Sequence, residues 1–322
     1  MVNSICPLVS VVFTSYNHKK YLRKALESLL NQTYSNIEII IVDDFSSDGS
    51  QQILKDYSNH SNVTLILQQI NSGSYVKASN FGASFAKGEY IIFAQCDDFS
   101  EITQIEKLVG VFIKSPTVGV VFSKSYLINE NSEIIGDDYN GREIKFKKVV
   151  KNSGLINGNK MKEFLSFTCV IPNLSAALIK RELFLETNGL SSDFLVLADW
   201  DFWIKLTEKT NFYYLNEPLN YFRQHNKTIR SSIKMKVQIL EAYKMFYNHI
   251  KDFNLTNAQK RQLKLGAGAV WFSYIVENRK IWLECFMIVL KDTLKYEKFN
   301  FYYFILGIMK HVMNAIQEKL KL

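Results

Sequence analysis

The sequence predicts an α/β fold in which a mixed, mostly parallel sheet is flanked by helices and followed by a C-terminal helical extension. Over the first hundred residues, runs of β-branched and aromatic residues alternate with segments whose apolar residues recur at helical spacing. No linker rich in glycine or proline divides the 322 residues, 47% of which are hydrophobic. From residue 231 onward only helical patterns occur. We therefore expect one large domain over residues 1–230 and a helical extension over residues 231–322.

Continuous apolar runs, typical of parallel strands buried on both faces, mark four strands in the first hundred residues. We expect strands over residues 9–13, 37–42, 63–67 and 90–94, and helices over residues 21–30, around residues 53–57 and over residues 78–86. Ser46 to Gly49 supply capping residues for the second of these helices. Ligands of such sheets bind outside the carboxyl ends of the strands.

The pattern from residue 101 to residue 230 is more mixed. We expect a helix over residues 103–113, a strand over residues 118–123, a polar basic loop over residues 137–151 and a helix around residues 199–208. The four cysteines are scattered, so we expect neither a zinc site nor a disulfide framework, and reduced thiols of a cytoplasmic protein are the default. The first residues lack a positively charged segment, and no signal peptide is expected.

The net charge of +8 is concentrated near the C-terminus, where residues 230–322 hold 16 Lys and Arg against 7 Asp and Glu. Basic segments attract anionic lipid or nucleic acid. Here the basic residues are interleaved with aliphatic helix faces, so nucleic-acid binding is not expected. Apolar residues recur there at helical spacing, at Phe301, Ile305, Ile308, Met309, Val312 and Ile316.

These C-terminal apolar runs are too short to span a bilayer, which needs about 20 residues. Two interpretations stay open. The helices pack on the large domain or pair two copies into a homodimer. Alternatively, they lie on an anionic membrane surface, which would place the protein peripherally at the inner face of the cytoplasmic membrane.

Adjacent carboxylates follow two of the predicted strands. Asp97-Asp98 repel each other unless a cation is shared, and oxygen ligands suit Mg²⁺ or Mn²⁺. Solvated acids in a turn would be the plainer interpretation. Asp43-Asp44 end a second strand and can accept the N–H and O–H donors of a nucleotide base or ribose. Tyr16, at the end of the first strand, can stack on a base.

Two further groups of polar residues occur later in the chain. Asp199 opens a helix, where it can cap the helix or act on a substrate, and Asp201 points away from it. Arg223 and His225 occupy alternate positions of an extended segment and hence one face. They can clamp a diphosphate, or His225 can ligate a metal.

Four stretches resemble the family 2 glycosyltransferases of the GT-A fold and occur in the order of that family. They run from VSVVFTSYNHKKYL to VDDFSSDGS, then NFGASFAKGEYIIFAQCDD, ADWDFWIKL and YFRQH, and cover roughly residues 8–230. The resemblance implies a nucleotide-sugar-binding half over residues 1–100 and an acceptor-binding half over residues 101–230. Departures from the family pattern occur at Thr14, Phe45, Ser79, Gln95 and Ala198.

The resemblance also implies roles for matching residues. Asp199 would be the catalytic base. Asp97, Asp98 and His225 would bind the metal. The donor nucleotide sugar would be held by Thr14, Tyr16, Asp43, Asp44, Lys77, Asn80, Asp97 and Arg223.

The activity implied is an inverting transfer that needs Mn²⁺ or Mg²⁺. It would move a sugar from a nucleoside-diphosphate sugar, by default a UDP-sugar, to a hydroxyl of a glycan or lipid-linked oligosaccharide in bacterial-type surface polysaccharide synthesis. A metal-dependent nucleotidyltransferase and a non-catalytic sugar-nucleotide-binding module stay as alternatives. A dinucleotide-dependent oxidoreductase is disfavoured because no glycine follows the first strand between Thr14 and His18.

Overall fold

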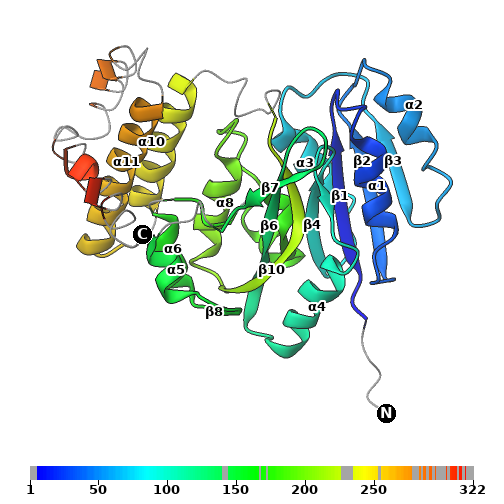
Figure 1. The fold of residues 1–322 in the computed structure, drawn as a ribbon, viewed down its shortest axis with the longest axis horizontal. Helices are drawn as coiled ribbons and strands as arrows, with labels where there is room; N and C mark the ends of the chain where they lie inside the picture. Colours follow the sequence, from blue (N-terminus) through cyan, green and yellow to red (C-terminus); the bar gives the residue numbers. More distant parts are fainter. Residues whose placement is uncertain are drawn as a thin grey trace.

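A computed structural model gives the structure of the protein (Figure 1). It describes residues 6–139, 144–166, 168–171, 173–225, 235–252 and 255–277, and single positions or short runs between 283 and 316. The strands are β1 (Val9–Ser15), β2 (Ile37–Asp43), β3 (Val63–Leu67), β4 (Tyr90–Gln95), β5 (Phe99–Ser100), β6 (Val118–Ile128), β7 (Ile134–Asp137), β8 (Gly154–Ile156), β9 (Ala177–Lys180) and β10 (Asn211–Arg223).

The helices that precede β10 are α1 (Leu22–Leu30), α2 (Ser50–Lys55), α3 (Tyr75–Ala83), α4 (Gln104–Lys114), α5 (Ile144–Val149), α6 (Gly158–Leu165), α7 (Arg181–Glu186) and α8 (Ala198–Leu206), with a 3₁₀ turn η1 (Leu174–Ala176). Two longer helices follow, α10 (Met235–Asp252) and α11 (Asn257–Glu277).

One mixed sheet organises the chain, in the order β3-β2-β1-β4-β9-β6-β10-β5, with β7 on β6 and β8 on β10. Strands β3, β2, β1 and β4 run parallel to one another, so their carboxyl ends meet at one edge. Ser15 of β1 lies opposite Asp43 of β2, and Thr14 lies opposite Gln95 of β4. The loops that carry Tyr16, Asp44 and Asp97 therefore leave the sheet side by side. The mixed α/β fold predicted from the sequence is confirmed.

Successive side chains of a strand point to opposite faces of the sheet, and the apolar ones form two cores, one on each face. Val12 of β1 belongs to a core that α3, α6, α8, α10 and α11 cover. Val11 and Phe13 belong to a second core that α1 and α4 cover. Both faces are apolar, which explains why the strands read as continuous hydrophobic runs.

Two local expectations need correction. The helix expected over residues 78–86 is α3 and begins at Tyr75, because the Ser74 hydroxyl caps it by accepting a hydrogen bond from the N–H of Val76. The loop expected over residues 137–151 contains the short helix α5. Phe146 explains it, since its side chain is fully buried with its ring centre 5.1 Å from that of Phe164. One buried aromatic among lysines is too weak a pattern to predict a helix.

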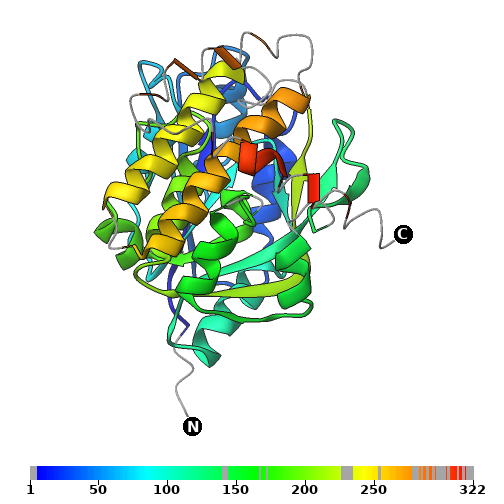
Figure 2. The ribbon, with the colours of Figure 1, turned by 90° about the vertical axis from the view of Figure 1, so that its left-hand side faces the viewer.

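The C-terminal helices α10 and α11 pack against each other and lie at the end of the molecule away from β3 (Figures 1 and 2). Tyr243 of α10 and Trp271 of α11 are buried in the same core as α8. A Cβ atom on Gly307 would come within 2.5 Å of the backbone of Gly268 and Ala269, so a later helical segment presses closely on α11. Among the residues that the structure describes, no helix is both long and apolar enough to cross a bilayer.

Candidate active site

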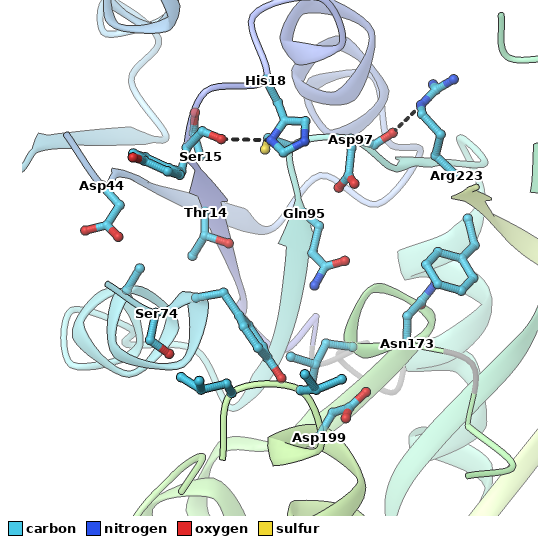
Figure 3. A pocket seen from close by; sticks show the side chains of 18 of the residues that line it. Thr14, Ser15, His18, Asp44, Ser74, Gln95, Asp97, Asn173, Asp199 and Arg223 are labelled. Atoms are coloured by element: carbon cyan, nitrogen blue, oxygen red, sulfur yellow. Dashed lines mark hydrogen bonds between the residues drawn. The ribbon is translucent and has the colours of Figure 1, made fainter. Parts of the chain in front are cut away.

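A cavity of about 350 Å³ opens at the carboxyl edge of the parallel strands. Its walls come from the loops after β1, β2 and β4, the start of α3, the segment before η1, the start of α8 and the end of β10. Figure 3 shows Asp44, Asp97 and Asp199 at different places around the cavity, with Asp199 across from Asp97. Residues predicted from distant stretches of sequence thus meet in one place.

Three of the lining or adjacent side chains could hold a metal ion. One ligand atom from each of His18, Asp97 and His225 lies within 4.8 Å of the others. The Nε2 atom of His225 lies 3.0 Å from Oδ2 of Asp97. The Nδ1 atom of His18 lies 2.8 Å from the carbonyl oxygen of Tyr16, which can only accept, so Nδ1 carries the proton and Nε2 presents its lone pair.

The kinds of ligand atom that these three residues offer favour some cations over others. Mg²⁺ prefers oxygen ligands throughout, whereas imidazole nitrogens are ligands of transition-metal ions. The three residues therefore fit Mn²⁺ better than Mg²⁺. His18 was not among the predicted ligands. The available signal was its position three residues after β1, at the same sheet edge as Asp97.

Asp97 and Asp98 are adjacent but point in different directions. Burial alone would raise the pKa of Asp97, but the hydrogen bond with His225 and the electrostatic interaction with His18 outweigh it and lower the pKa overall. Asp98 is buried outside the cavity, and its carboxylate accepts hydrogen bonds from Ser175 Oγ at 2.7 Å and from the N–H of Arg223 at 2.9 Å. Burial and the charge of Asp97 raise the pKa of Asp98 well above its usual range.

The structure places Asp98 away from the group of side chains that could bind a metal ion. Its oxygens face Ser175 and β10, and the cluster that can bind a metal contains His18 in its place. Asp97 and Asp98 lie in the short connection between β4 and β5, and of the two only Asp97 lines the cavity.

In the pair Asp43-Asp44, too, only one carboxylate faces the cavity. Asp43 is fully buried and does not line the cavity, because its carboxylate accepts hydrogen bonds from the N–H and hydroxyl of Ser46 and from Gln51. Asp44 lines the cavity. Of the two carboxylates, the one that faces the cavity is that of Asp44, while Asp43 shapes the loop that carries it.

Of four other residues predicted at the donor site, two line the cavity and two do not. Thr14 and Tyr16 line the cavity, and the Tyr16 side chain is 47% exposed, so its ring is accessible for stacking. Lys77 is exposed on α3 and lies outside the cavity lining. Asn80 is used within the protein, where its amide donates to the carbonyl of Leu190 and accepts from the N–H of the same residue. The geometry therefore does not bring Lys77 and Asn80 to the site.

Arg223 lines the cavity, but its guanidinium binds the chain itself. Its Nε donates to the carbonyl of Asp97 at 2.7 Å, and its two terminal nitrogens donate to the carbonyl of Asn129 and the hydroxyl of Ser132. The ring of Tyr21 lies 4.2 Å below the guanidinium carbon. Arg223 thus braces the Asp97 loop against the β6–β7 hairpin.

Asp199 lies in the first turn of α8 and lines the cavity. Its Oδ1 accepts a hydrogen bond from the N–H of Trp200 at 2.8 Å, which fixes the direction of the carboxylate. Asp201 points away, as expected, and its carboxylate lies 3.0 Å from His249 and 2.7 Å from Lys205. A carboxylate across the cavity from the Asp97 cluster can take a proton from a bound hydroxyl.

The comparisons with known proteins agree with this architecture. A family model described as Glycosyl transferase family 2 matches residues 10–165. An uncharacterized glycosyltransferase of Haemophilus influenzae is 31% identical over 230 residues, which cover 70% of this chain and 71% of that protein. The chain belongs to glycosyl transferase family 2.

Solved structures show the same fold. S. aureus TarS 1-349 in complex with UDP-GlcNAc superposes with a TM-score of 0.69 at 18% identity, over 98% of this chain and 91% of that one. The mannosyltransferase PcManGT of Pyrobaculum calidifontis, in complex with GDP-Man and Mn²⁺, superposes with a TM-score of 0.55 at 16% identity, over 95% and 87% of the two chains. The match covers nearly the whole chain, the C-terminal helices included.

Proposed function

We propose that this glycosyltransferase uses a nucleoside-diphosphate sugar and Mn²⁺ and inverts the anomeric configuration during transfer. The observation that carries the proposal is the shared cavity, which His18 and Asp97 line together with Asp199, while His225 lies next to Asp97. TarS and PcManGT, which share the fold, bind UDP-GlcNAc and GDP-Man respectively, and the latter also binds Mn²⁺.

The chemistry follows from the two sides of the cavity. His18, Asp97 and His225 would hold the cation, which neutralises the charge that develops on the departing diphosphate. Asp199 takes the proton of the acceptor hydroxyl while that oxygen forms its bond to the anomeric carbon. The bond from that carbon to the diphosphate oxygen breaks, and its electron pair leaves with the nucleoside diphosphate. A single displacement of this kind inverts the configuration.

The surroundings of Asp44 favour uracil as the donor base. Its carboxylate already accepts from Gln68 at 3.0 Å and from the N–H and hydroxyl of Ser72, both at 2.8 Å. A carboxylate has about four lone-pair sites, so about one remains. Uracil presents one ring N–H, whereas guanine presents a ring N–H and an amino group. Tyr16 would stack on the base.

The acceptor we propose is a hydroxyl of a glycan or lipid-linked oligosaccharide, as in surface polysaccharide synthesis. Leu195, which is 41% exposed, and Val196 line the cavity beside Asp199 and give the acceptor an apolar wall. Sugar rings pack their C–H faces on such walls. Membership of the glycosyltransferase family supports transfer to an acceptor over the nucleotidyltransferase alternative.

We further propose that the C-terminal segment contacts an anionic membrane at the cytoplasmic face. Described side chains of that segment are apolar and exposed: Leu283, Met287, Leu294, Tyr302, Ile305, Met309, Val312, Met313 and Ile316. Residues 230–322 carry 16 Lys and Arg against 7 Asp and Glu, so their charge complements anionic lipid.

A donor panel tests the catalytic proposal. Thermal melting with UDP-, GDP-, dTDP- and CMP-sugars, each with Mn²⁺, Mg²⁺ or EDTA, identifies the donor and the cation. We expect the largest stabilisation from a UDP-sugar with Mn²⁺. Proton NMR of the product formed from that donor then reports the anomeric configuration. A product with retained configuration, or release of pyrophosphate instead of nucleoside diphosphate, would refute the mechanism.

A further inference from the structure

One buried carboxylate of helix α10 binds the loop that precedes α8, the helix that carries Asp199. Glu241 is 7% exposed. Its Oε1 accepts a hydrogen bond from the N–H of Leu195 at 2.6 Å, and its Oε2 accepts from the N–H groups of Val196 at 2.9 Å and Leu197 at 3.1 Å. One side chain thus satisfies three consecutive backbone donors.

The charge of Glu241 suits this position. Leu197 is the residue that precedes α8, so the three N–H groups lie at the N-terminal end of that helix, where the helix dipole is positive. Consecutive N–H groups that converge on one point form a site for an anion. Here the anion is supplied by another helix of the same chain. The loop conformation therefore depends on α10 being docked.

Two more contacts connect α10 to the residues that flank Asp199. The rings of Trp200 and Phe246 meet edge to face with centres 5.5 Å apart. Two turns beyond Glu241 on the same helix, His249 lies 3.0 Å from the carboxylate of Asp201. Asp199 therefore sits between a loop fixed on its N-terminal side and two side chains fixed on its C-terminal side.

Residues whose backbone is bound by Glu241 also line the cavity. Leu195, Val196 and Asp199 all line it, and the first two donate their N–H groups to Glu241. We propose that Glu241 is a positioning residue, which sets the place of the catalytic base and of the wall beside it through the backbone of residues 195–197. This inference rests on the proposed role of Asp199 as the base.

The substitution Glu241→Gln tests the inference, since it keeps the size of the side chain and removes the charge and one acceptor oxygen. We expect kcat with the donor chosen in the melting panel to fall about tenfold to a hundredfold, because small displacements of a catalytic group have effects of that size. Affinity for UDP with Mn²⁺, measured by calorimetry, should stay at the wild-type value, because Glu241 does not touch the Asp97 side of the cavity.

Met245→Ala is the matched control. Met245 lies on the same helix and is fully buried in the core, so its truncation destabilises α10 without removing the Glu241 contacts. At a temperature where both variants are folded, Met245→Ala should keep kcat. If it lowered kcat as much as Glu241→Gln did, the effect would be one of general stability and the inference would be wrong.

Hydrogen exchange of the wild-type protein gives a test that needs no variant and no turnover. The amides of Leu195, Val196 and Leu197 should exchange slowly, in step with α10, because all three are hydrogen-bonded to Glu241. Fast exchange at these three amides would overturn the inference. If the wild type transferred no sugar at all, the proposed function would fail, and the exchange result would still decide whether α10 holds the loop.

Discussion

His225 Nε2 lies 3.0 Å from Asp97 Oδ2, although the two residues are 128 positions apart in the chain. Asp97 follows β4, and the short strand β5 comes directly after it. Antiparallel pairing of β5 with β10 places Phe99 opposite Tyr221, with their rings stacked at 4.2 Å. The pairing brings the end of β10 back to the loop after β4. The proximity of His225 to Asp97 thus depends on this two-residue strand.

Asp199→Asn should slow transfer strongly while leaving donor binding intact. A general base contributes about a hundredfold to ten-thousandfold to the rate, so we expect kcat to fall within that range. Calorimetry with UDP and Mn²⁺ should give the wild-type affinity. Asp193→Asn, at an exposed acid of the same loop that pairs with Lys244, is the control and should stay active. Near-normal turnover of Asp199→Asn would remove the base assignment.

His18→Gln should weaken Mn²⁺ binding, because it removes one of three candidate ligands. We expect a loss of about tenfold or more in Mn²⁺ affinity, measured by titration in the presence of UDP. Without added metal, the variant and the wild type should bind UDP equally. His60→Gln, in the turn between α2 and β3 and outside the cavity lining, serves as the control. Equal Mn²⁺ affinity in His18→Gln and wild type would show that His18 is not a ligand.

Asp201 should make the protein acid-sensitive. Burial alone would raise the pKa of Asp201, but the contacts with His249 and Lys205 outweigh it and lower the pKa overall. A carboxyl whose pKa is depressed by folding stabilises the protein above its unfolded pKa of about 3.9 and ceases to do so as the pH falls through the folded value.

Urea unfolding between pH 3 and pH 7 checks this expectation. Removing one partner of a buried pair costs about 3–5 kcal/mol, so Asp201→Asn should lower the free energy of unfolding by an amount of that order at neutral pH. The difference from wild type should shrink below about pH 4. If the difference in the free energy of unfolding stayed constant from pH 3 to pH 7, the protonation of Asp201 would not be coupled to folding and the expectation would be wrong.

Phe45→Gly should stabilise the fold. Phe45 has φ of 67°, and its side chain is 51% exposed. This left-handed conformation costs a residue other than glycine about 1–2 kcal/mol, so we expect a gain of about 1 kcal/mol in the free energy of unfolding. Asn188→Gly, at φ of 58°, should gain less, because asparagine tolerates this conformation. Unchanged stability of Phe45→Gly in urea unfolding would indicate compensating contacts of the ring.

The double substitution Met309→Glu and Met313→Glu should abolish flotation with vesicles that contain anionic lipid. The two side chains are 56% and 58% exposed, and the added charges oppose both insertion and attraction to the lipid. Ile70→Glu, at a side chain that is 78% exposed in the large domain, is the control and should not affect flotation. If the wild-type protein did not bind the vesicles but was a dimer by light scattering, the membrane proposal would be wrong and the homodimer would be favoured.

Much of the fold could be predicted from the sequence, for a physical reason. Parallel strands buried on both faces need unbroken β-branched runs, so β1 to β4 were visible, and the acids that follow them had to gather at one edge. Local pattern could not show which acid of a pair faces the cavity. That depends on the loop after the strand, as with Asp44, whose neighbour Asp43 is held by Ser46.

The residues that the sequence did not identify depend on contacts between distant elements. His18 joins Asp97 only because β1 and β4 pair in register. Glu241 read as an ordinary helix residue in a basic segment, and its function follows from how α10 docks against α8. Sequence alone therefore determined the strands, the sheet edge and the kinds of side chain available. Tertiary packing decided which atoms meet, because hydrogen bonds and metal sites require positions within a few ångströms that local periodicity does not specify.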